Sequence, residues 1–301
     1  MYLFKTKQSI LIIVSALLVL SFYGYDKLFT APEFFPVGKN FIIDEDESLK
    51  SISNRLEKEN YINSALLFRS YISFIGSDRK VQLGGYSFDV PSSFFGVTSK
   101  FTSGKPNMPL IKVTIPEGST VIEVANLVRE VLPNINVDNF IAKVYRVKAE
   151  GKLFPSTYFL LPSMTEIKVI EKMTQTFHKK YLSIYDNVQA PVELKSVDEI
   201  ISLAAILEGE AKTKDDMKIV SGILLKRLEI GMPLQVDVAP ETYKKKGLPE
   251  YPINNPGLVA IGAVFNRIES PYLYYLTGKD GTMYYAKTFE EHKINIRKYL
   301  K

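Results

Sequence analysis

Cysteine is absent from this chain of 301 residues, and histidine is almost absent. Without cysteine the protein has no disulfides, no thiolate metal ligands and no cysteine nucleophile. The two histidines, His178 and His292, lie far apart in the sequence, which disfavours a histidine-rich zinc site or a histidine-based catalytic triad. We therefore expect no metal ion and no cofactor, and we expect any catalysis to depend on carboxylates.

A strong excess of one charge is also lacking. The formal net charge is +5 and is spread along the sequence, which gives no basis for a nucleic-acid-binding surface. Hydrophobic residues make up 46% of the chain and charged residues 24%, a balance typical of globular and not of disordered proteins. The length exceeds the roughly 100 to 200 residues of a typical domain, so we expect two folded units.

The N-terminal residues 9–25 contain no charged side chain, follow Lys5 and Lys7, and precede Asp26. As a helix this stretch would be roughly 25 Å long, at the short end of a membrane crossing. A cleaved signal peptide is the alternative, but its cleavage site needs small residues where this chain has bulky aromatics. We expect residues 1–28 to be a cytoplasmic tip and a single-pass anchor in the cell (inner) membrane, with the body of the protein periplasmic or otherwise extracytoplasmic.

After a linker at residues 29–38, two segments resemble each other. They are FIIDEDESLKSISNRL, which begins at Phe41, and VTIPEGSTVIEVANLV, which begins 72 residues later at Val113. In each, a short apolar strand leads through an acid to a helix with one apolar face, and we expect the two strand–helix units to pack together. Residues 81–106 show no helical period and predict short strands and turns that complete a small α+β module over residues 39–145.

The aromatic side chains of this module, among them Tyr86, Phe94 and Phe95, allow two interpretations. They could stack on sugar rings, or they could form the core of the module. We favour the core.

The stretch SVDEIISLAAILEGEAK predicts a helix that begins at Ser196, because Ser196 and Glu199 have the spacing of a capping box. The helix is apolar nearly all round, which is typical of a buried helix, yet it carries Glu208 and Glu210. A carboxyl group buried without a partner stays protonated, which is what a general acid needs. Glu208 shares its side of the helix with two alanines, which would let a ligand approach. From spacing alone, a salt-bridged or end-exposed glutamate remains an equal alternative.

Polar residues of the next segments are candidates for a binding groove. A second helix is expected over residues 214–230. Gln235 and Asp237 follow it at alternate positions of an extended strand or loop, so that both could face one cleft. The loop at residues 244–257 is rich in proline and glycine, which fits either a groove wall or a plain connection. Its Asn255 is the expected cap of the helix that follows, with proline next in the chain.

The C-terminal residues predict two further elements. Residues 271–287 read as a hairpin with GKDG at the turn, and residues 288–300 read as a last helix that carries His292.

The ordered segments of the second half resemble one protein family. SLAAILEGEA, IGMPLQVD, GLPEYPINNPG, PYLYYL and TFEEHKINIRKYL follow one another as in the YceG-like (MltG-type) endolytic murein transglycosylases, and VTIPEGST and EGKLFPSTY resemble what precedes that family's catalytic domain. The resemblance implies fold class α+β with three parts after one another: an N-terminal transmembrane helix, a small LysM-like α+β module over residues 39–145, and a mixed α/β catalytic domain over residues 146–301.

This family cleaves the β-1,4 bond between N-acetylmuramic acid and N-acetylglucosamine within nascent peptidoglycan strands and leaves 1,6-anhydro ends, which limits strand elongation. The resemblance implies that Glu208, the first acid of ILEGEA, is catalytic, and that Gln235, Asp237, Asn255 and His292 contact the substrate. One acid suffices because the sugar's own 6-hydroxyl attacks, in contrast to the two carboxylates of ordinary glycosidases. The implied partners are peptidoglycan glycan strands, the membrane and wall-synthesis proteins.

The chain departs from the family pattern at several positions. Between Asp237 and Gly247 it has only VAPETYKKK, where the family usually has a longer segment, and Glu250, Tyr251 and Lys293 replace other residue types. A non-catalytic, membrane-anchored peptidoglycan-binding or scaffold protein is therefore the alternative. A hydrolytic muramidase, with Asp237 as the second acid, is a third possibility.

Overall fold

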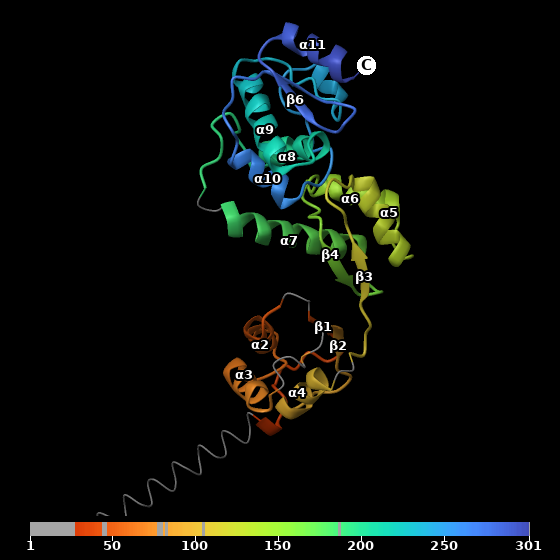
Figure 1. Cartoon of the computed structure of the whole chain (residues 1–301). Coiled ribbons are helices and arrows are strands. Elements are labelled where there is room, and N and C mark those ends of the chain that lie inside the picture. Colours follow the sequence, from red (N-terminus) through yellow and green to blue (C-terminus); the bar gives the residue numbers. More distant parts are fainter. Residues whose placement is uncertain are drawn as a thin grey trace, which may run out of the picture. The chain divides into compact units, whose positions relative to one another are not determined.

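The computed structural model describes residues 28–43, 47–76, 81, 84–103, 106–185 and 188–300 (Figure 1). A membrane anchor was expected within residues 1–28. Its apolar stretch, residues 9–25, lies outside the described residues. Within the described part, no helix is both long enough and apolar enough to cross a bilayer.

The chain divides into two compact units between Ile111 and Lys112. Both units combine α-helices with two-stranded sheets, which confirms the expected α+β class. The domain boundary expected between residues 145 and 146 does not coincide with this division and stays a prediction.

The first unit begins with a strand–helix–helix–strand order. Its elements are β1 (Asn40–Ile43), α2 (Leu49–Lys58), α3 (Ala65–Phe74), β2 (Gly84–Ser87) and α4 (Phe94–Thr102). β1 and β2 pair antiparallel, with Phe41 opposite Tyr86. Serine side chains cap the helices: Ser48 accepts from the backbone of Ser51, and Ser64 accepts from the backbone of Leu67.

The core of the first unit is largely aromatic. Phe41, Tyr61 and Phe68 are fully buried, and Phe101 lies edge-on to Tyr86 with 4.4 Å between the ring centroids. Tyr86 and Phe94 also belong to this core, so the core interpretation is confirmed for them.

The absence of a helix between residues 81 and 106 is a wrong prediction. α4 begins after Ser93, whose hydroxyl accepts from the backbone of Gly96. Its buried residues follow the helical spacing i, i+3, i+4, i+7 and are Phe94, Val97, Thr98 and Phe101. The helix has only nine residues and lies among glycine and serine residues, so its helical pattern is too short to recognise in the sequence.

The second unit begins with the same order of elements: β3 (Ile111–Thr114), α5 (Val121–Val131), α6 (Val137–Arg146) and β4 (Thr157–Leu160). The strands β3 and β4 form a two-stranded sheet, and the backbone of Ile115 donates to Ser156. Helix α5 has a complete capping box of Thr120 and Glu123. The helices of the two units begin 72 residues apart, at Leu49 and Val121 and again at Ala65 and Val137. Each expected strand–helix copy is therefore the first half of a βααβ repeat, and the two strands of each repeat pair with each other.

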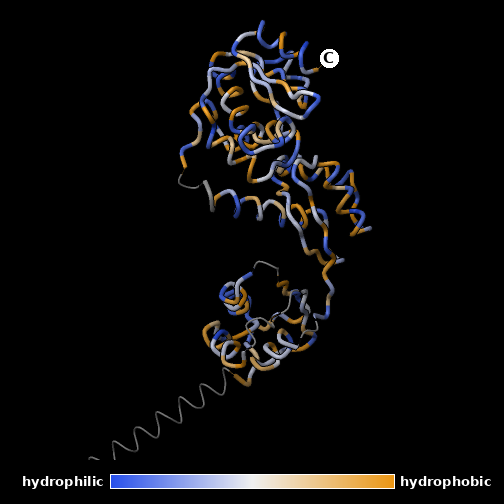
Figure 2. Tube along the Cα trace, viewed as in Figure 1, coloured by the Kyte–Doolittle hydropathy of each residue, from blue (hydrophilic) through white to orange (hydrophobic). Residues whose placement is uncertain are grey.

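The rest of the second unit surrounds one buried helix. Its elements are α7 (Glu166–Tyr185), α8 (Val197–Glu210), α9 (Lys214–Glu229), the 3-10 helix η1 (Pro240–Tyr243), α10 (Leu258–Phe265), β5 (Tyr274–Thr277), β6 (Met283–Ala286) and α11 (Phe289–Tyr299). Hydrophobic residues gather along α8, which packs against α9 and α10 (Figures 1 and 2). Ser196 accepts from Glu199 at the start of α8 as expected, while the Glu199 carboxylate accepts from the backbone of Lys195.

The expected hairpin is confirmed. β5 and β6 pair antiparallel, with Tyr275 opposite Tyr285, and α11 lies against both strands. Thr288 caps α11 by accepting from the backbone of Glu291.

Gly222 provides a test of how closely the loop before this hairpin packs on α9. A Cβ added there would lie 2.1 Å from the carbonyl oxygen of Ile268, whose backbone also donates to Lys218. In an unconstrained helix, Gly→Ala stabilises by about 0.5 to 1 kcal/mol. We expect Gly222→Ala to do the opposite and to lower the free energy of unfolding by about 1 to 3 kcal/mol in denaturant titrations. Gly96→Ala, where the nearest atom would be 3.4 Å away, is the matched control; equal stabilisation by both would contradict this packing.

Candidate active site

The last turn of α8 carries two acids, and they leave the helix in different directions. Residues 200–207 of this helix are all buried. Between the acids, Gly209 admits a loop so closely that a Cβ there would lie 2.8 Å from Cγ1 of Val238. The Glu210 carboxylate accepts from the backbone of Val238, and the Glu208 carboxylate accepts from the backbone of Gly257. Two different loops therefore meet the two carboxyl groups.

Glu210 lines a cavity of about 500 Å³, called the Glu210 cavity below. This is a volume typical of small-ligand sites. Its lining comes from α8, α9, the loop 235–243, β5 and α11: Glu210, Arg227, Gln235, Asp237, Tyr243, Tyr274, Tyr275, Leu276, Thr277, Phe289, His292, Ile296 and Leu300. Three of the predicted site residues, Gln235, Asp237 and His292, are thus brought together with Glu210.

The Glu210 carboxyl group is poised to hold a proton. Its Oε1 accepts from the backbone of Val238 at 3.3 Å. Burial is the largest influence and raises the pKa of Glu210 above its ordinary value; the backbone of Val238 and the hydroxyl of Tyr275 lower it, and the charge of Asp237 raises it. The net shift is upward, so Glu210 keeps its proton to a higher pH than an exposed glutamate.

Arg227 places a positive charge beside this carboxyl group. The side chain is 4% exposed, its Nε donates to the carbonyl of Leu273 at 2.8 Å, and its Nη1 donates to the carbonyl of Leu234. No ion pair of Arg227 with a carboxylate is found among the described residues. Arg227 therefore ties β5 to the loop that carries Gln235, and its charge is left to act on the cavity.

The segment 235–239 was expected to be an extended strand or a loop, and it is a loop with a tight turn. Gln235 has a positive φ of 48°, and an isolated bridge joins Val236 to Ala239. Thr242 holds the turn, because its hydroxyl accepts from Val236 and donates to Ala239. Gln235 and Asp237 still face one cavity, although the turn and not a strand brings them there.

Asp237 anchors an aromatic ring at the edge of the cavity. Tyr243, which is 50% exposed, donates its hydroxyl to Oδ1 of Asp237 at 2.7 Å. This hydrogen bond and then burial raise the pKa of Tyr243 to about 12, so the phenol stays a donor at physiological pH. An exposed, fixed ring beside a cavity is a surface on which a sugar can stack.

His292 enters the cavity from α11. Its ring stacks on Tyr274 with 5.4 Å between centroids and an interplanar angle of 25°. Burial, followed by the charge of Arg227, lowers the pKa of His292, and its buried Nδ1 has no hydrogen-bond partner among the described residues. The imidazole is therefore neutral near pH 7 and has polar capacity left for a ligand.

Glu208 lies elsewhere, at the start of α10. Its Oε2 accepts from the backbone N–H of Gly257 at 2.9 Å, and Gly257, the N-cap of α10, has no side chain to offer. Burial raises the pKa of Glu208, the hydrogen bond from Gly257 lowers it, and the charge of Glu117 raises it. Glu208 is not among the residues that line the Glu210 cavity.

Asn255 was expected to cap this helix, and that prediction is wrong. The side chain is fully buried, its Nδ2 donates to the carbonyl of Ser119 at 2.8 Å, and its Oδ1 accepts from the backbone of Leu153 at 2.8 Å. Asn255 therefore joins the βααβ repeat of this unit to the core around α8, while Glu208 supplies the acceptor that α10 needs.

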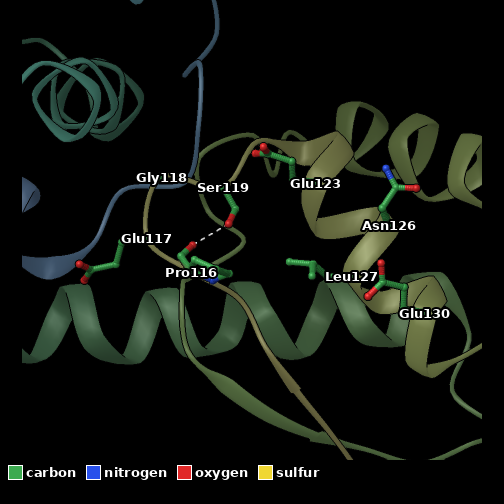
Figure 3. Close-up of a pocket in the computed structure, with 8 residues that line it drawn as sticks. All are labelled: Pro116, Glu117, Gly118, Ser119, Glu123, Asn126, Leu127 and Glu130. Atoms are coloured by element: carbon green, nitrogen blue, oxygen red, sulfur yellow. Dashed lines mark hydrogen bonds between the residues drawn. The ribbon is translucent and has the colours of Figure 1, made fainter.

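A second cavity of about 450 Å³ lies beside α5 and contains none of the predicted site residues (Figure 3). Figure 3 shows Ser119 hydrogen-bonded to Pro116 and Glu117 pointing away from the side chains of α5. Glu117 contacts the start of α10, since a Cβ on Gly257 would lie 1.9 Å from its Oε1. The lining includes Glu117, Glu123 and Glu130 but no basic residue. This cavity therefore differs from the Glu210 cavity, which contains Arg227.

Arg227, Tyr243 and Tyr275 are the residues of the Glu210 cavity that sequence reasoning missed. Arg227 carried a signal, because it falls at helical spacing from Val220 and Leu224, both buried, and an arginine on a buried face needs a reason. The two tyrosines carried none, since tyrosine is common in strands and loops.

Comparison with known proteins identifies the family of this chain. The model of the YceG-like family matches residues 41–240 and 241–298. The chain is 24% identical to the endolytic murein transglycosylase of Streptococcus pneumoniae (serotype 2, strain D39), over 97% of this chain and 64% of that protein. It is also 24% identical to the endolytic murein transglycosylase of Bacillus subtilis strain 168, over 87% of this chain and 84% of that protein. The chain thus spans 64% of the length of the pneumococcal relative.

A solved structure supports the fold. The crystal structure of a putative YceG-like protein from Listeria monocytogenes superposes with a TM-score of 0.54 at 24% identity, and the match covers 85% of this chain and 98% of that one. Because the family model spans most of the sequence, the chain belongs to the YceG-like family.

Proposed function

We propose that this chain is an endolytic lytic transglycosylase that cleaves the β-1,4 bond between N-acetylmuramic acid and N-acetylglucosamine within nascent peptidoglycan strands. Its family membership and the names of its relatives support this activity. The observation that carries the proposal is the Glu210 cavity, in which one desolvated carboxyl group lies among polar and aromatic side chains.

The reaction needs one group that gives and then takes back a proton. Glu210 protonates the glycosidic oxygen while the bond from that oxygen to C1 of N-acetylmuramic acid breaks, and the N-acetylglucosamine part leaves with a 4-hydroxyl. The 6-hydroxyl oxygen of the muramic acid then bonds to C1, and its proton returns to Glu210. The product has a 1,6-anhydro end, no water is consumed, and the second carboxylate of ordinary glycosidases is not required.

The neighbours of Glu210 have complementary roles in this proposal. The guanidinium of Arg227 favours the carboxylate that forms when the proton leaves. Gln235 and the neutral His292 supply hydrogen bonds to sugar substituents. Asp237 holds Tyr243 in place, and the Tyr243 ring stacks on a sugar.

Glu208, which the sequence predicted as the catalytic residue, remains the alternative. We favour Glu210 because it shares the cavity with Gln235, Asp237 and His292, whereas the carboxylate of Glu208 binds the start of α10. A carboxyl oxygen there satisfies an otherwise open backbone donor at the start of the helix. Substrate contact by Asn255 stays a prediction, and its buried hydrogen bonds favour a structural role.

The remaining parts of the chain fit the same role. We propose that residues 39–145, which hold the first βααβ repeat and the first three elements of the second, form a LysM-like module that binds glycan. Residues 146–301 would be the catalytic domain. Residues 1–28 would anchor the protein in the cell membrane, and residues 29–38 would link the anchor to an extracytoplasmic body. This location gives access to peptidoglycan strands and to wall-synthesis proteins.

The two glutamates provide a matched pair of variants. We expect Glu210→Gln in the full chain to fold normally and to lower the rate of strand cleavage at least about 100-fold, because a general acid contributes that much or more. Glu208→Gln can still accept from Gly257, so it should retain most of the activity. The measurement is mass spectrometry of fragments from uncrosslinked peptidoglycan strands, which identifies 1,6-anhydro ends and cleavage within strands.

Each other outcome has a defined meaning. Loss of cleavage in Glu208→Gln alone would restore the sequence prediction and reject Glu210. Reducing ends in place of anhydro ends would identify a hydrolytic muramidase with Asp237 as the second acid. Binding of the strands without cleavage by the unaltered chain would identify the non-catalytic binding protein.

The pH dependence of stability tests the burial of Glu208, which opposes the ionised form more strongly than the hydrogen bond from Gly257 favours it. Its pKa is raised in the folded state, so its contribution is fully present below the unfolded pKa and is lost as the pH rises through the folded pKa. Glutamine cannot ionise, so we expect the free energy of unfolding of Glu208→Gln, relative to the unaltered chain, to increase as the pH rises above the ordinary glutamate range. Glu229→Gln, at an exposed position at the end of α9, controls for the removal of one negative charge. A difference that does not change with pH would contradict this assignment.

A further inference from the structure

The hairpin β5–β6 places two tyrosines opposite each other, and their hydroxyl groups have different surroundings. Tyr275 on β5 pairs with Tyr285 on β6. The Tyr285 hydroxyl donates to Oδ1 of Asp216 at 2.5 Å, outside the Glu210 cavity. The Tyr275 side chain lines the Glu210 cavity; its hydroxyl oxygen is buried and has no partner with hydrogen-bond geometry among the described residues.

A buried hydroxyl without a partner is unusual in a folded protein. Leaving such a group unpaired is unfavourable, so phenylalanine would suit the resting structure better. The Tyr275 side chain nevertheless lines the same cavity as Glu210, and its hydroxyl lowers the pKa of Glu210, as a hydrogen-bond donor to the carboxylate does. We therefore infer that the Tyr275 hydroxyl is needed when Glu210 is ionised.

Proton transfer changes what Glu210 needs from its neighbours. The protonated carboxyl group has one O–H that donates a hydrogen bond. The carboxylate has no donor, and both of its oxygens need donors from neighbouring groups. Oε1 already accepts from the backbone of Val238. Burial and the charge of Glu210 raise the pKa of Tyr275 well above its usual value, so its hydroxyl keeps its proton and stays available as a donor.

We propose that Tyr275 is a positioning residue that donates its hydroxyl to Glu210 when the acid has given its proton to the glycosidic oxygen. This inference rests on the proposed function and goes beyond it, because it assigns to Tyr275 the control of the pH range in which the acid works.

The other groups around Glu210 fix the direction of the effect. The charge of Asp237, from the loop 235–239, raises the pKa of Glu210, and the backbone N–H of Val238 lowers it. Arg227, from α9, attracts the carboxylate, while Tyr243 and the neutral His292 add no charge near pH 7. Tyr275 lowers the pKa of Glu210, whereas burial and the charge of Asp237 raise it, so removal of the Tyr275 hydroxyl raises the pKa of Glu210. The acid would then stay protonated to a higher pH.

The test is Tyr275→Phe in the full chain, with Tyr285→Phe as the matched control from the facing position of the same hairpin. We expect Tyr275→Phe to move the alkaline limb of kcat upward by about half to one pH unit, the equivalent of one hydrogen bond. KM should change less than twofold, and the Tm should stay the same or rise. Tyr285→Phe should lower the Tm, because it removes the bond to Asp216, and should leave the alkaline limb where it is.

A second measurement does not depend on activity. Titration of the Glu210 carboxyl carbon by 13C NMR, assigned with Glu210→Gln, should give a higher pKa in Tyr275→Phe than in the unaltered chain and in Tyr285→Phe. An unmoved titration, or an unmoved alkaline limb in a protein that Glu210→Gln inactivates, would overturn the inference alone. Full activity of Glu210→Gln would overturn the proposed function, while the NMR titration would still decide whether Tyr275 acts on Glu210.

Discussion

The burial of α8 is the constraint on which the site depends. Its residues 200–207 are all buried in a core that α7, α9, α10 and several loops build around it, so the helix does not expose one face to water in the usual way. The two carboxyl groups at its last turn therefore need partners from the loops that pack against that turn. Gly209 makes this possible, because it lets the loop at Val238 come down onto the helix between them.

The two acids are accommodated by different physical means. Glu208 receives a backbone donor at the start of α10, so a helix that lacks a side-chain cap gains one from another part of the chain. Glu210 receives one long hydrogen bond from Val238, and it lies in a cavity with aromatic rings, Arg227, Gln235 and Asp237. Burial thus makes ionisation of Glu210 unfavourable, and a carboxyl group that keeps its proton in this way can serve as a general acid.

Local signals in the sequence predicted the local structure well. Ser196 begins α8, the hairpin pairs as expected, and the repeat seen in two short segments extends to two complete βααβ units. The choice between Glu208 and Glu210 could not be made in this way. Glu208 meets a residue 49 positions away and Glu210 one 28 positions away, and nothing in the helix itself encodes which loop arrives on which side. Helix α4 escaped prediction for another reason, because nine residues with glycine and serine around them give too short a period to recognise.

The hydrogen bonds of Asn255 also constrain how the chain reaches its native state. They join Asn255 to Leu153 and Ser119, which precede it by 102 and 136 residues. During synthesis from the N-terminus, the backbone groups of the loop at Ser119 and of the turn at Leu153 have no native partner until residue 255 has emerged. The βααβ repeat of the second unit can form its helices early, but its attachment to the core must wait for the last third of the chain, and a contact so distant in sequence slows the final step of folding.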